Sequence, residues 1–370
     1  MAYAERIAKL TEWMRRDVIE AVLLVDEEGR RDPSIRYLTG HPSDGLLFLR
    51  SDGRTLLIPW DAILAGRLAT ADEVIPYSEY ERSLPVAFEK SVERLGLSGR
   101  IELAASTPYP VYAELAARYK AGDLVCRETG LGKVLLEQRS LKDDEEIAKI
   151  REAARLTNAI LELVEDRVAG SRSTTEVDMA LFVEQEARSR GAEAMAFESL
   201  VAGPTRSWGI HAFPAYGGGP FGGTGMSIFD FGVVVDGYPS DVTLTVARGK
   251  LSTRQEEMIE LVERAYELAA LRARPGAECF EVAQAVNELF GSKGYSMPHS
   301  LGHGIGLQVH EAPYLRARRE SSVALVPGMV FTIEPGLYDE EAGGVRWEND
   351  FLVTSSGCEV LTTSRILRFP

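Results

Sequence analysis

The chain has 370 residues, of which 45% are hydrophobic and 26% are charged, and its formal net charge at pH 7 is −15. These values are typical of a globular protein, and the length indicates two domains rather than one core. The negative charge argues against a nucleic-acid-binding protein, and no apolar run is long enough to predict a membrane span.

The start of the chain, residues 1–16, has the pattern of an amphipathic helix with acidic residues, unlike a secretory signal peptide. The three cysteines have no paired spacing, so they indicate neither a disulfide framework nor a thiolate metal site. They are Cys126, Cys279 and Cys358. We therefore expect a cytoplasmic protein.

Residues 1–130 are predicted to form a small α/β domain. Short apolar runs indicate strands at 21–25, 45–49, 55–59 and 100–104, and helical periodicity indicates helices at 1–16, 81–96 and 107–119. No glycine-rich phosphate-binding signature follows any of these strands. His41 is expected in a solvent-exposed loop.

Residues 131–370 are predicted to form an α+β domain, with helices packed on an antiparallel sheet. Amphipathic patterns and capping residues indicate helices at 141–168, 173–190, 253–274 and 278–292. Strands are expected between the second and third helices and after the fourth.

The stretch from Ile228 to Thr245, IFDFGVVVDGYPSDVTLT, is typical of a β-hairpin. Asp236-Gly237 is a dipeptide that accepts the positive φ angles of a two-residue turn. With that turn Val235 pairs with Tyr238, Asp230 faces Thr243, and Asp241 faces Gly232. Asp230 and Asp241 then share one face, with Cα atoms roughly 7–8 Å apart. Two carboxylates there repel each other and resist burial, and a cation between them would relieve both effects.

Three histidines fall in the glycine-rich stretch MPHSLGHGIGLQVHEAP, and two glutamates follow on apolar strands. One interpretation of these histidines is that they are hydrogen-bonded within the core of the protein. The other is that they contribute to a metal site. Four carboxylates and one imidazole would be neutralised by two divalent cations, and this set suits Mn²⁺, Co²⁺, Fe²⁺ or Zn²⁺. Two such ions can lower the pKa of a water and polarise a carbonyl. The five residues are Asp230, Asp241, His303, Glu334 and Glu348.

The motifs FDFG…GYPSDVT, SLGHGIGLQVHE, FTIEPG and GGVRWEND resemble those of the pita-bread metallopeptidases: prolidases, Xaa-Pro aminopeptidases and methionine aminopeptidases. The resemblance covers roughly residues 140–370. The preceding domain resembles the amino-terminal α/β domain of the creatinase and prolidase branch, which methionine aminopeptidases usually lack. The resemblance implies a pita-bread catalytic domain with helices packed on a curved antiparallel sheet.

The resemblance also implies roles for individual residues. Asp230 would bind one metal ion, His303 and Glu334 the other, while Asp241 and Glu348 would bridge both. Glu334 would also handle a proton. His211 would contact substrate near the scissile bond, and His310 would stabilise the tetrahedral intermediate. His299 and Arg346 would support the site from its outer shell. The implied cofactors are two divalent ions, with manganese expected first, and the implied assembly is a homodimer.

Two positions depart from the family pattern. Leu244 replaces an arginine that is often present, and Tyr314 stands where prolidases often carry an arginine for the substrate carboxylate. We therefore expect an Xaa-Pro aminopeptidase that acts on small peptides. The alternatives are an Xaa-Pro dipeptidase, in which Arg316 or Arg318 replaces the missing arginine, a hydrolase of a small non-peptide amide, and a catalytically silent binding module.

Overall fold

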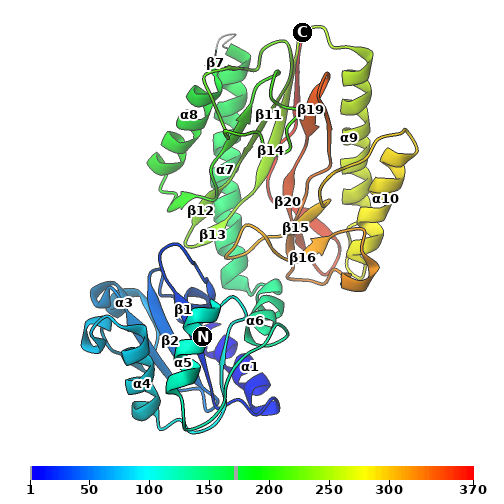
Figure 1. The fold of residues 1–370 in the computed structure, drawn as a ribbon. Coiled ribbons are helices and arrows are strands. Elements are labelled where there is room, and N and C mark those ends of the chain that lie inside the picture. The colour runs from blue at the N-terminus through cyan, green and yellow to red at the C-terminus, as the bar shows by residue number, and fades with distance from the viewer. Residues whose placement is uncertain (1, 171–173) are drawn as a thin grey trace. The chain divides into compact units, whose positions relative to one another are not determined.

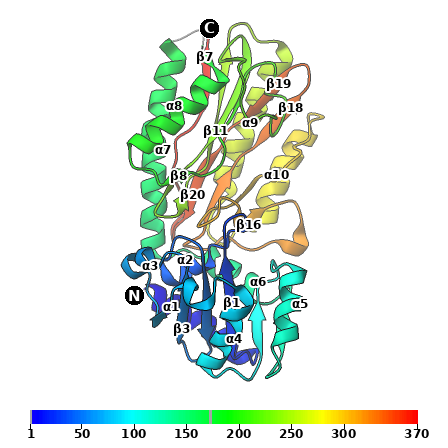
Figure 2. The same cartoon turned by 60° about the vertical axis from the view of Figure 1, so that its left-hand side comes forward.

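A computed structural model describes residues 2–170 and 174–370, and the chain divides into two compact units, residues 1–139 and 140–370 (Figures 1 and 2). Ser173, where the second helix of the catalytic region was expected to begin, lies outside the described residues. Among the described residues, no helix combines the length and the apolar character that crossing a membrane requires.

The first unit contains a six-stranded mixed sheet in the order β4-β3-β2-β1-β5-β6. Its strands are β1 (Ala21–Asp26), β2 (Gly45–Arg50), β3 (Thr55–Pro59), β4 (Glu73–Val74), β5 (Ile101–Leu103) and β6 (Leu124–Cys126). The helical segments are α1 (Ala2–Arg16), α2 (Ser34–Thr39), α3 (Ala62–Leu68), η1 (Tyr77–Tyr80), α4 (Leu84–Leu95), α5 (Tyr109–Arg118) and α6 (Leu131–Ser140). The predicted strands and longer helices are present, whereas α2 and α3 are too short to produce a readable helical period.

The expectation that His41 is exposed to solvent is wrong. His41 lies between α2 and β2, but its side chain is 0% exposed. Its Nε2 atom lies 3.2 Å from the carbonyl oxygen of Asp44, and burial lowers the pKa of the imidazole. A polar residue in a loop can be buried when the loop itself folds back on the sheet, which local sequence does not reveal.

The second unit confirms the α+β prediction. Its helices are α7 (Asp144–Gly170), α8 (Glu176–Ser189), α9 (Thr253–Arg272), α10 (Cys279–Gly291) and the short η2 (Arg319–Ser321). Capping boxes begin two of them, Thr175 with Asp178 at α8 and Ser252 with Gln255 at α9. Figures 1 and 2 show α7 and α8 on one side of the strands and α9 and α10 on the other.

The strands of this unit form several small sheets, mostly antiparallel. One has the order β22-β14-β11-β9, another β16-β15-β17-β20-β21, and smaller sheets are β13-β12-β8, β18-β19 and β10-β7. The bounds are β7 (Thr174–Thr175), β8 (Ala194–Met195), β9 (Leu200–Ala202), β10 (Pro220–Phe221), β11 (Gly225–Phe231), β12 (Val233–Val235), β13 (Tyr238–Pro239), β14 (Val242–Arg248), β15 (Gly302–Gly304), β16 (Glu311–Leu315), β17 (Val330–Ile333), β18 (Gly336–Asp339), β19 (Gly343–Arg346), β20 (Asn349–Val353), β21 (Cys358–Val360) and β22 (Ile366–Phe369).

Each pair of long helices covers its own apolar core. Phe229 and Leu244 on β11 and β14 pack with the buried faces of α7 and α8. Phe331 and Phe351 on β17 and β20 pack with α9 and α10. The neighbouring positions, which point to the other face of each strand, include the opposed pairs Asp230 with Thr243 and Thr332 with Asp350.

The predicted hairpin is confirmed. Val235 pairs with Tyr238, and the same register places Asp230 opposite Thr243. Asp236 and Gly237 have φ angles of 48° and 86°, as the tight turn requires. The hairpin contributes to two sheets. Its tip (β12 and β13) belongs to one sheet, and its base (β11 and β14) belongs to another.

We predict that Gly237→Ala destabilises the second unit, because a Cβ atom at positive φ costs about 1 kcal/mol. The melting temperature should fall by about 2–4 °C for a domain of this size. Gly218→Ala is the matched control, since a Cβ atom there meets open space and no positive φ is required. An unchanged melting temperature for Gly237→Ala in differential scanning calorimetry would contradict the assigned turn.

Candidate active site

A single pocket of about 580 Å³ in the second unit is lined by the five expected metal ligands and the five residues expected to contact substrate or support the site. These residues come from segments more than a hundred positions apart in the chain, and antiparallel pairing brings them together. They are Asp230, Asp241, His303, Glu334, Glu348, His211, His299, His310, Tyr314 and Arg346. Apolar side chains complete the wall, among them Phe197, Leu200 and Phe213.

Glycines on both sides of His303 allow its strand to lie very close to its neighbours. A Cβ atom on Gly302 would lie 1.9 Å from the carbonyl oxygen of Thr332, and one on Gly304 would lie 2.1 Å from that of Ala312. Neither contact is sterically possible, so only glycine fits at these positions. The close packing fixes the backbone of His303 and therefore the direction of its ring.

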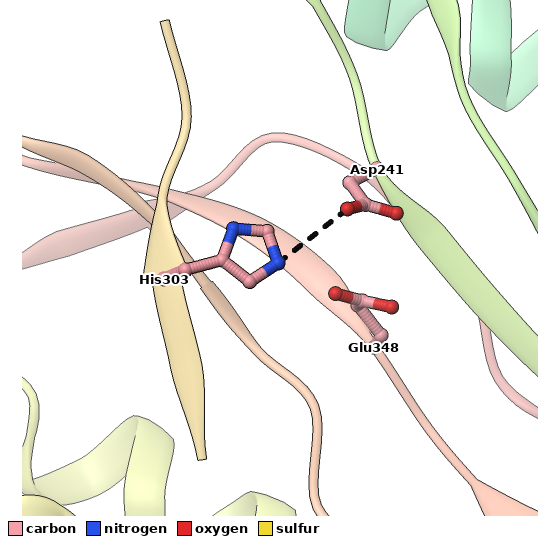
Figure 3. A group of neighbouring side chains, drawn as sticks. All are labelled: Asp241, His303 and Glu348. Atoms are coloured by element: carbon pink, nitrogen blue, oxygen red, sulfur yellow. Dashed lines mark ion pairs between the residues drawn. The ribbon is translucent and has the colours of Figure 1, made fainter. Parts of the chain in front are cut away.

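His303, Asp241 and Glu348 form the centre of the site (Figure 3). Each of the three side chains offers one possible ligand atom, a ring nitrogen or a carboxylate oxygen, and these three atoms all lie within 4.8 Å of one another. His303 Nε2 is 3.6 Å from Asp241 Oδ2 and 3.5 Å from Glu334 Oε1. His303 Nδ1 lies 3.2 Å from the carbonyl of Gly304, which can only accept a hydrogen bond, so Nδ1 carries the proton. The lone pair of Nε2 therefore points at the carboxylates.

Arg346 forms hydrogen bonds with Asp230 and with two neighbouring hydroxyl groups. Its Nη2 atom donates to Asp230 Oδ2 at 2.6 Å, and its Nε atom donates to Thr243 Oγ1 at 3.0 Å. Its Nη1 atom donates to the hydroxyl of Tyr338 at 2.9 Å. Asp230 Oδ1 is buried and, among the described residues, has no hydrogen-bond partner. One oxygen of Asp230 is thus held in place while the other is left available.

Residues next to the predicted ligands orient them, and sequence analysis did not single these out. Thr243 Oγ1 donates to Glu348 Oε2 at 2.7 Å, and Asp350 Oδ2 accepts from the backbone N–H of Asp241 at 3.0 Å. Thr243 could have been found from the hairpin register, which sets it opposite Asp230. The Asp350 contact joins positions 109 residues apart, so no local signal in the sequence indicates it.

The electrostatics of the pocket disfavour four ionised carboxylates without cations. Burial raises the pKa of Asp230 to about 7 in spite of Arg346. Burial, followed by repulsion from Glu348, raises the pKa values of Asp241 and Glu334 well above their usual range. Burial also lowers the pKa of His303 to about 4, so its imidazole is neutral at pH 7. A neutral imidazole beside carboxyls that lack cations is a suitable donor set for divalent metal ions.

Three further histidines surround this centre. The His310 ring centroid is 4.1 Å from that of His303, and the side chain is exposed to the pocket. His299 Nδ1 lies 2.8 Å from the Ser300 carbonyl and its Nε2 lies 3.1 Å from the Tyr338 hydroxyl. His211 lies in the loop between β9 and β10 and is also exposed.

Arg316 also lines the pocket, beside Tyr314. Its guanidinium carbon is 4.2 Å from the Tyr314 ring centroid, and its Nε atom donates to Ser300 Oγ at 3.1 Å. Among the described residues Arg316 has no acidic partner. Arg318 instead lines a neighbouring pocket of about 380 Å³.

Comparisons with known proteins agree with this geometry. Residues 148–355 match the model of metallopeptidase family M24, and residues 6–139 match the creatinase/prolidase N-terminal domain. An Xaa-Pro dipeptidase of Pyrococcus horikoshii is 29% identical over 363 residues, 97% of each chain. The crystal structure of the prolidase from the same organism has a TM-score of 0.85 at 27% identity and covers 97% of this chain and 98% of that one. An X-Pro aminopeptidase from Thermotoga maritima has a TM-score of 0.82 at 28% identity, with 97% and 99% covered.

We predict that the metal-free protein becomes less stable as pH rises from 6.5 to about 8. Burial raises the pKa of Asp230 from 3.8 to about 7 and the pKa values of Asp241 and Glu334 well above their usual range, so in this pH range the folded state holds protons that the unfolded chain has already released. His299, His303 and His310, with pKa values lowered to about 4, act in the opposite direction only until the unfolded histidines, whose ordinary pKa is 6.5, have lost their protons, so most of their contribution is complete near pH 7 and the carboxyls outweigh the remainder.

Scanning calorimetry of protein treated with a chelator measures this dependence. Saturating Mn²⁺ should raise the melting temperature more at pH 8 than at pH 6.5, because the ions bind ionised carboxylates. A metal-free melting temperature that rises across this range would contradict the assigned electrostatics.

Proposed function

The chain belongs to metallopeptidase family M24, and from this membership we propose that it hydrolyses the Xaa-Pro bond at the amino terminus of short peptides. The observation that carries the proposal is the pocket in which four buried or partly buried carboxyls and the Nε2 atom of His303 converge. The names of the relatives, an Xaa-Pro dipeptidase and an X-Pro aminopeptidase among them, support the choice of bond.

Membership of this family implies divalent metal ions, and we propose two per chain. Asp230 would hold one and His303 with Glu334 the other, while Asp241 and Glu348 would contact both. The unpartnered Asp230 Oδ1 and the free lone pair of His303 fit such ions. Because the donors are oxygen-rich with one nitrogen, we propose Mn²⁺ first, with Co²⁺, Fe²⁺ and Zn²⁺ as alternatives. When bound, the ions would lower the pKa of a water molecule and polarise the scissile carbonyl.

The side chains of the pocket would carry out the remaining tasks. Glu334, whose carboxylate is 17% exposed, would take a proton from the attacking water and return it to the proline nitrogen. His310 would donate an N–H hydrogen bond to the oxygen that becomes negative in the tetrahedral intermediate. His211 would contact substrate near the scissile bond, and Arg346 would keep Asp230 oriented. A homodimer remains a prediction of the family resemblance, and a cytoplasmic location remains a prediction from the sequence pattern.

A strict dipeptidase is the second candidate, and Arg316 is the observation that favours it. A dipeptide ends in a carboxylate directly after proline, and burying that charge requires a cationic partner. Tyr314 offers only a neutral hydroxyl, whereas Arg316 beside it lines the pocket without an acidic partner among the described residues. Arg316 could therefore replace the arginine that prolidases often carry at position 314.

The proposed function is tested with metal-loaded protein and a panel of Xaa-Pro dipeptides, Xaa-Pro-Yaa tripeptides and matched peptides without proline. We expect cleavage only of the bond before proline. Cleavage of all peptides alike would contradict the proposed specificity. Failure on every peptide, with metal bound, would favour a non-peptide amide substrate or a silent binding module.

We predict that His310→Ala lowers kcat by about 10²–10³-fold, the cost of removing one hydrogen bond to the developing oxyanion. The variant should keep its metal, because His310 is outside the proposed ligand set. Elemental analysis of the purified variant is the control. Loss of metal would identify His310 as a ligand, and unchanged turnover would identify it as structural.

We predict that Arg316→Ala acts selectively on dipeptides. The kcat/KM for Xaa-Pro dipeptides should fall by about 10–100-fold, as expected for loss of a charge-assisted hydrogen bond. The value for tripeptides should change little, because their carboxylate lies farther from proline. Arg318→Ala is the matched control, since Arg318 lines the neighbouring pocket only. Equal losses for both peptide lengths would show that Arg316 does not read the carboxylate.

A further inference from the structure

A loop that lines the active-site pocket is held at both ends by a buried carboxylate that lies outside the pocket. Glu176, the first residue of α8, is 1% exposed. Its Oε1 atom accepts the backbone N–H of Gly203 at 2.7 Å, and its Oε2 atom accepts that of Gly217, also at 2.7 Å. The loop between these glycines contributes pocket-lining residues: Ile210, His211, Ala212, Phe213 and Ala215.

We propose that Glu176 and Arg206 form a clasp that positions this loop for substrate binding. The proposal rests on the proposed function, because it assigns a role in binding the same peptides. Glu176 and Arg206 touch no substrate atom in this account, so they are positioning residues.

The helix and the loop bind each other through backbone as well as side chain. The N–H of Glu176 donates to the carbonyl of Gly219 at 2.9 Å, and that of Val177 donates to the carbonyl of Gly217 at 3.0 Å. A Cβ atom on Gly203 would lie 2.0 Å from the Pro220 carbonyl oxygen and 3.2 Å from Glu176 Oε1. The glycines of this segment thus permit close approach to the end of α8.

Arg206 extends the clasp into the loop. One of its terminal nitrogens pairs with Glu176 Oε2, and the other donates to the carbonyl of Pro214. Pro214 directly follows Phe213, which lines the pocket although its side chain is 96% exposed. Because the Phe213 ring packs against few other atoms, its position depends on its backbone. The contact of Arg206 with the Pro214 carbonyl holds that backbone one residue away.

The other part of the loop is attached to β19. Ser207 Oγ accepts the backbone N–H of Gly344 at 3.0 Å, and the carbonyl of Ile210 accepts from Arg346 Nη1 at 3.1 Å. Arg346 also bonds Asp230. His211 and Phe213 therefore lie between an anchor in the active site and the clasp at α8. Loss of the clasp would free the Phe213 end of the loop while the Arg346 end stays attached.

Arg206→Met tests the clasp, because Arg206 is partly exposed and the variant keeps both backbone donors to Glu176. We expect KM for Xaa-Pro peptides to rise about tenfold, kcat to change by less than about threefold, and metal content to be unchanged. Hydrogen exchange of a peptide that spans residues 203–217 should be faster than in the wild type. Arg190→Met is the control, since it removes an Arg–Glu pair, with Glu186, at the opposite end of α8 and away from the loop.

A second measurement separates the clasp from general destabilisation. In a Phe213→Ala background, Arg206→Met should raise KM by much less than in the wild type, because the two act through one segment. Glu176→Gln should also accelerate exchange in 203–217, since an amide cannot accept three donors as a carboxylate does.

Some outcomes would overturn the proposal. Wild-type KM and wild-type exchange in Arg206→Met would do so, and so would a fall in kcat together with loss of metal. If the wild type cleaves no Xaa-Pro peptide, the proposed function fails, and hydrogen exchange alone then decides whether the clasp exists.

Discussion

Repulsion among buried carboxylates is the constraint on which the rest of the catalytic unit depends. Asp230, Asp241, Glu334 and Glu348 face one pocket, and burial raises the pKa of each. Arg346 pairs with Asp230, but one arginine leaves most of this charge without compensation. These groups lie on or next to β11, β14, β17 and β20, strands that pack against the four long helices through apolar cores. Divalent ions are the natural complement of such a site.

Close backbone packing converts this electrostatic constraint into a defined geometry. Gly302 and Gly304 let the strand of His303 approach its neighbours more closely than any side chain would allow. Hydrogen bonds from Thr243 to Glu348 and from Arg346 to Asp230 then fix individual oxygens. The same principle recurs at the rim, where glycines let the loop of His211 meet the end of α8. The groups proposed to act on substrate are thus held by groups with no proposed contact to it.

The parts of the structure that could be predicted from sequence are those with a strong local signal. The hairpin register followed from the single dipeptide Asp236-Gly237, and with it the shared face of Asp230 and Thr243. Contacts between distant segments could not be predicted from such signals. The bond of Arg346 to Asp230 spans 116 positions, and that of Asp350 to Asp241 spans 109. His41 was assigned to solvent for the same reason, since its burial depends on tertiary packing. Family resemblance selected the pocket residues because motifs record such contacts indirectly.

The central claim is that the four carboxylates and His303 bind metal ions. Calorimetric titration of the metal-free protein with Mn²⁺ near pH 7, carried out in two buffers of different ionisation enthalpy, tests this most directly. We expect two ions per chain and net release of protons, because carboxyls with raised pKa values must ionise to bind them. Binding without proton release, or a stoichiometry that is unchanged in Asp241→Asn, would contradict it. Either result would mean that the four carboxylates and His303 are not the metal centre of this protein.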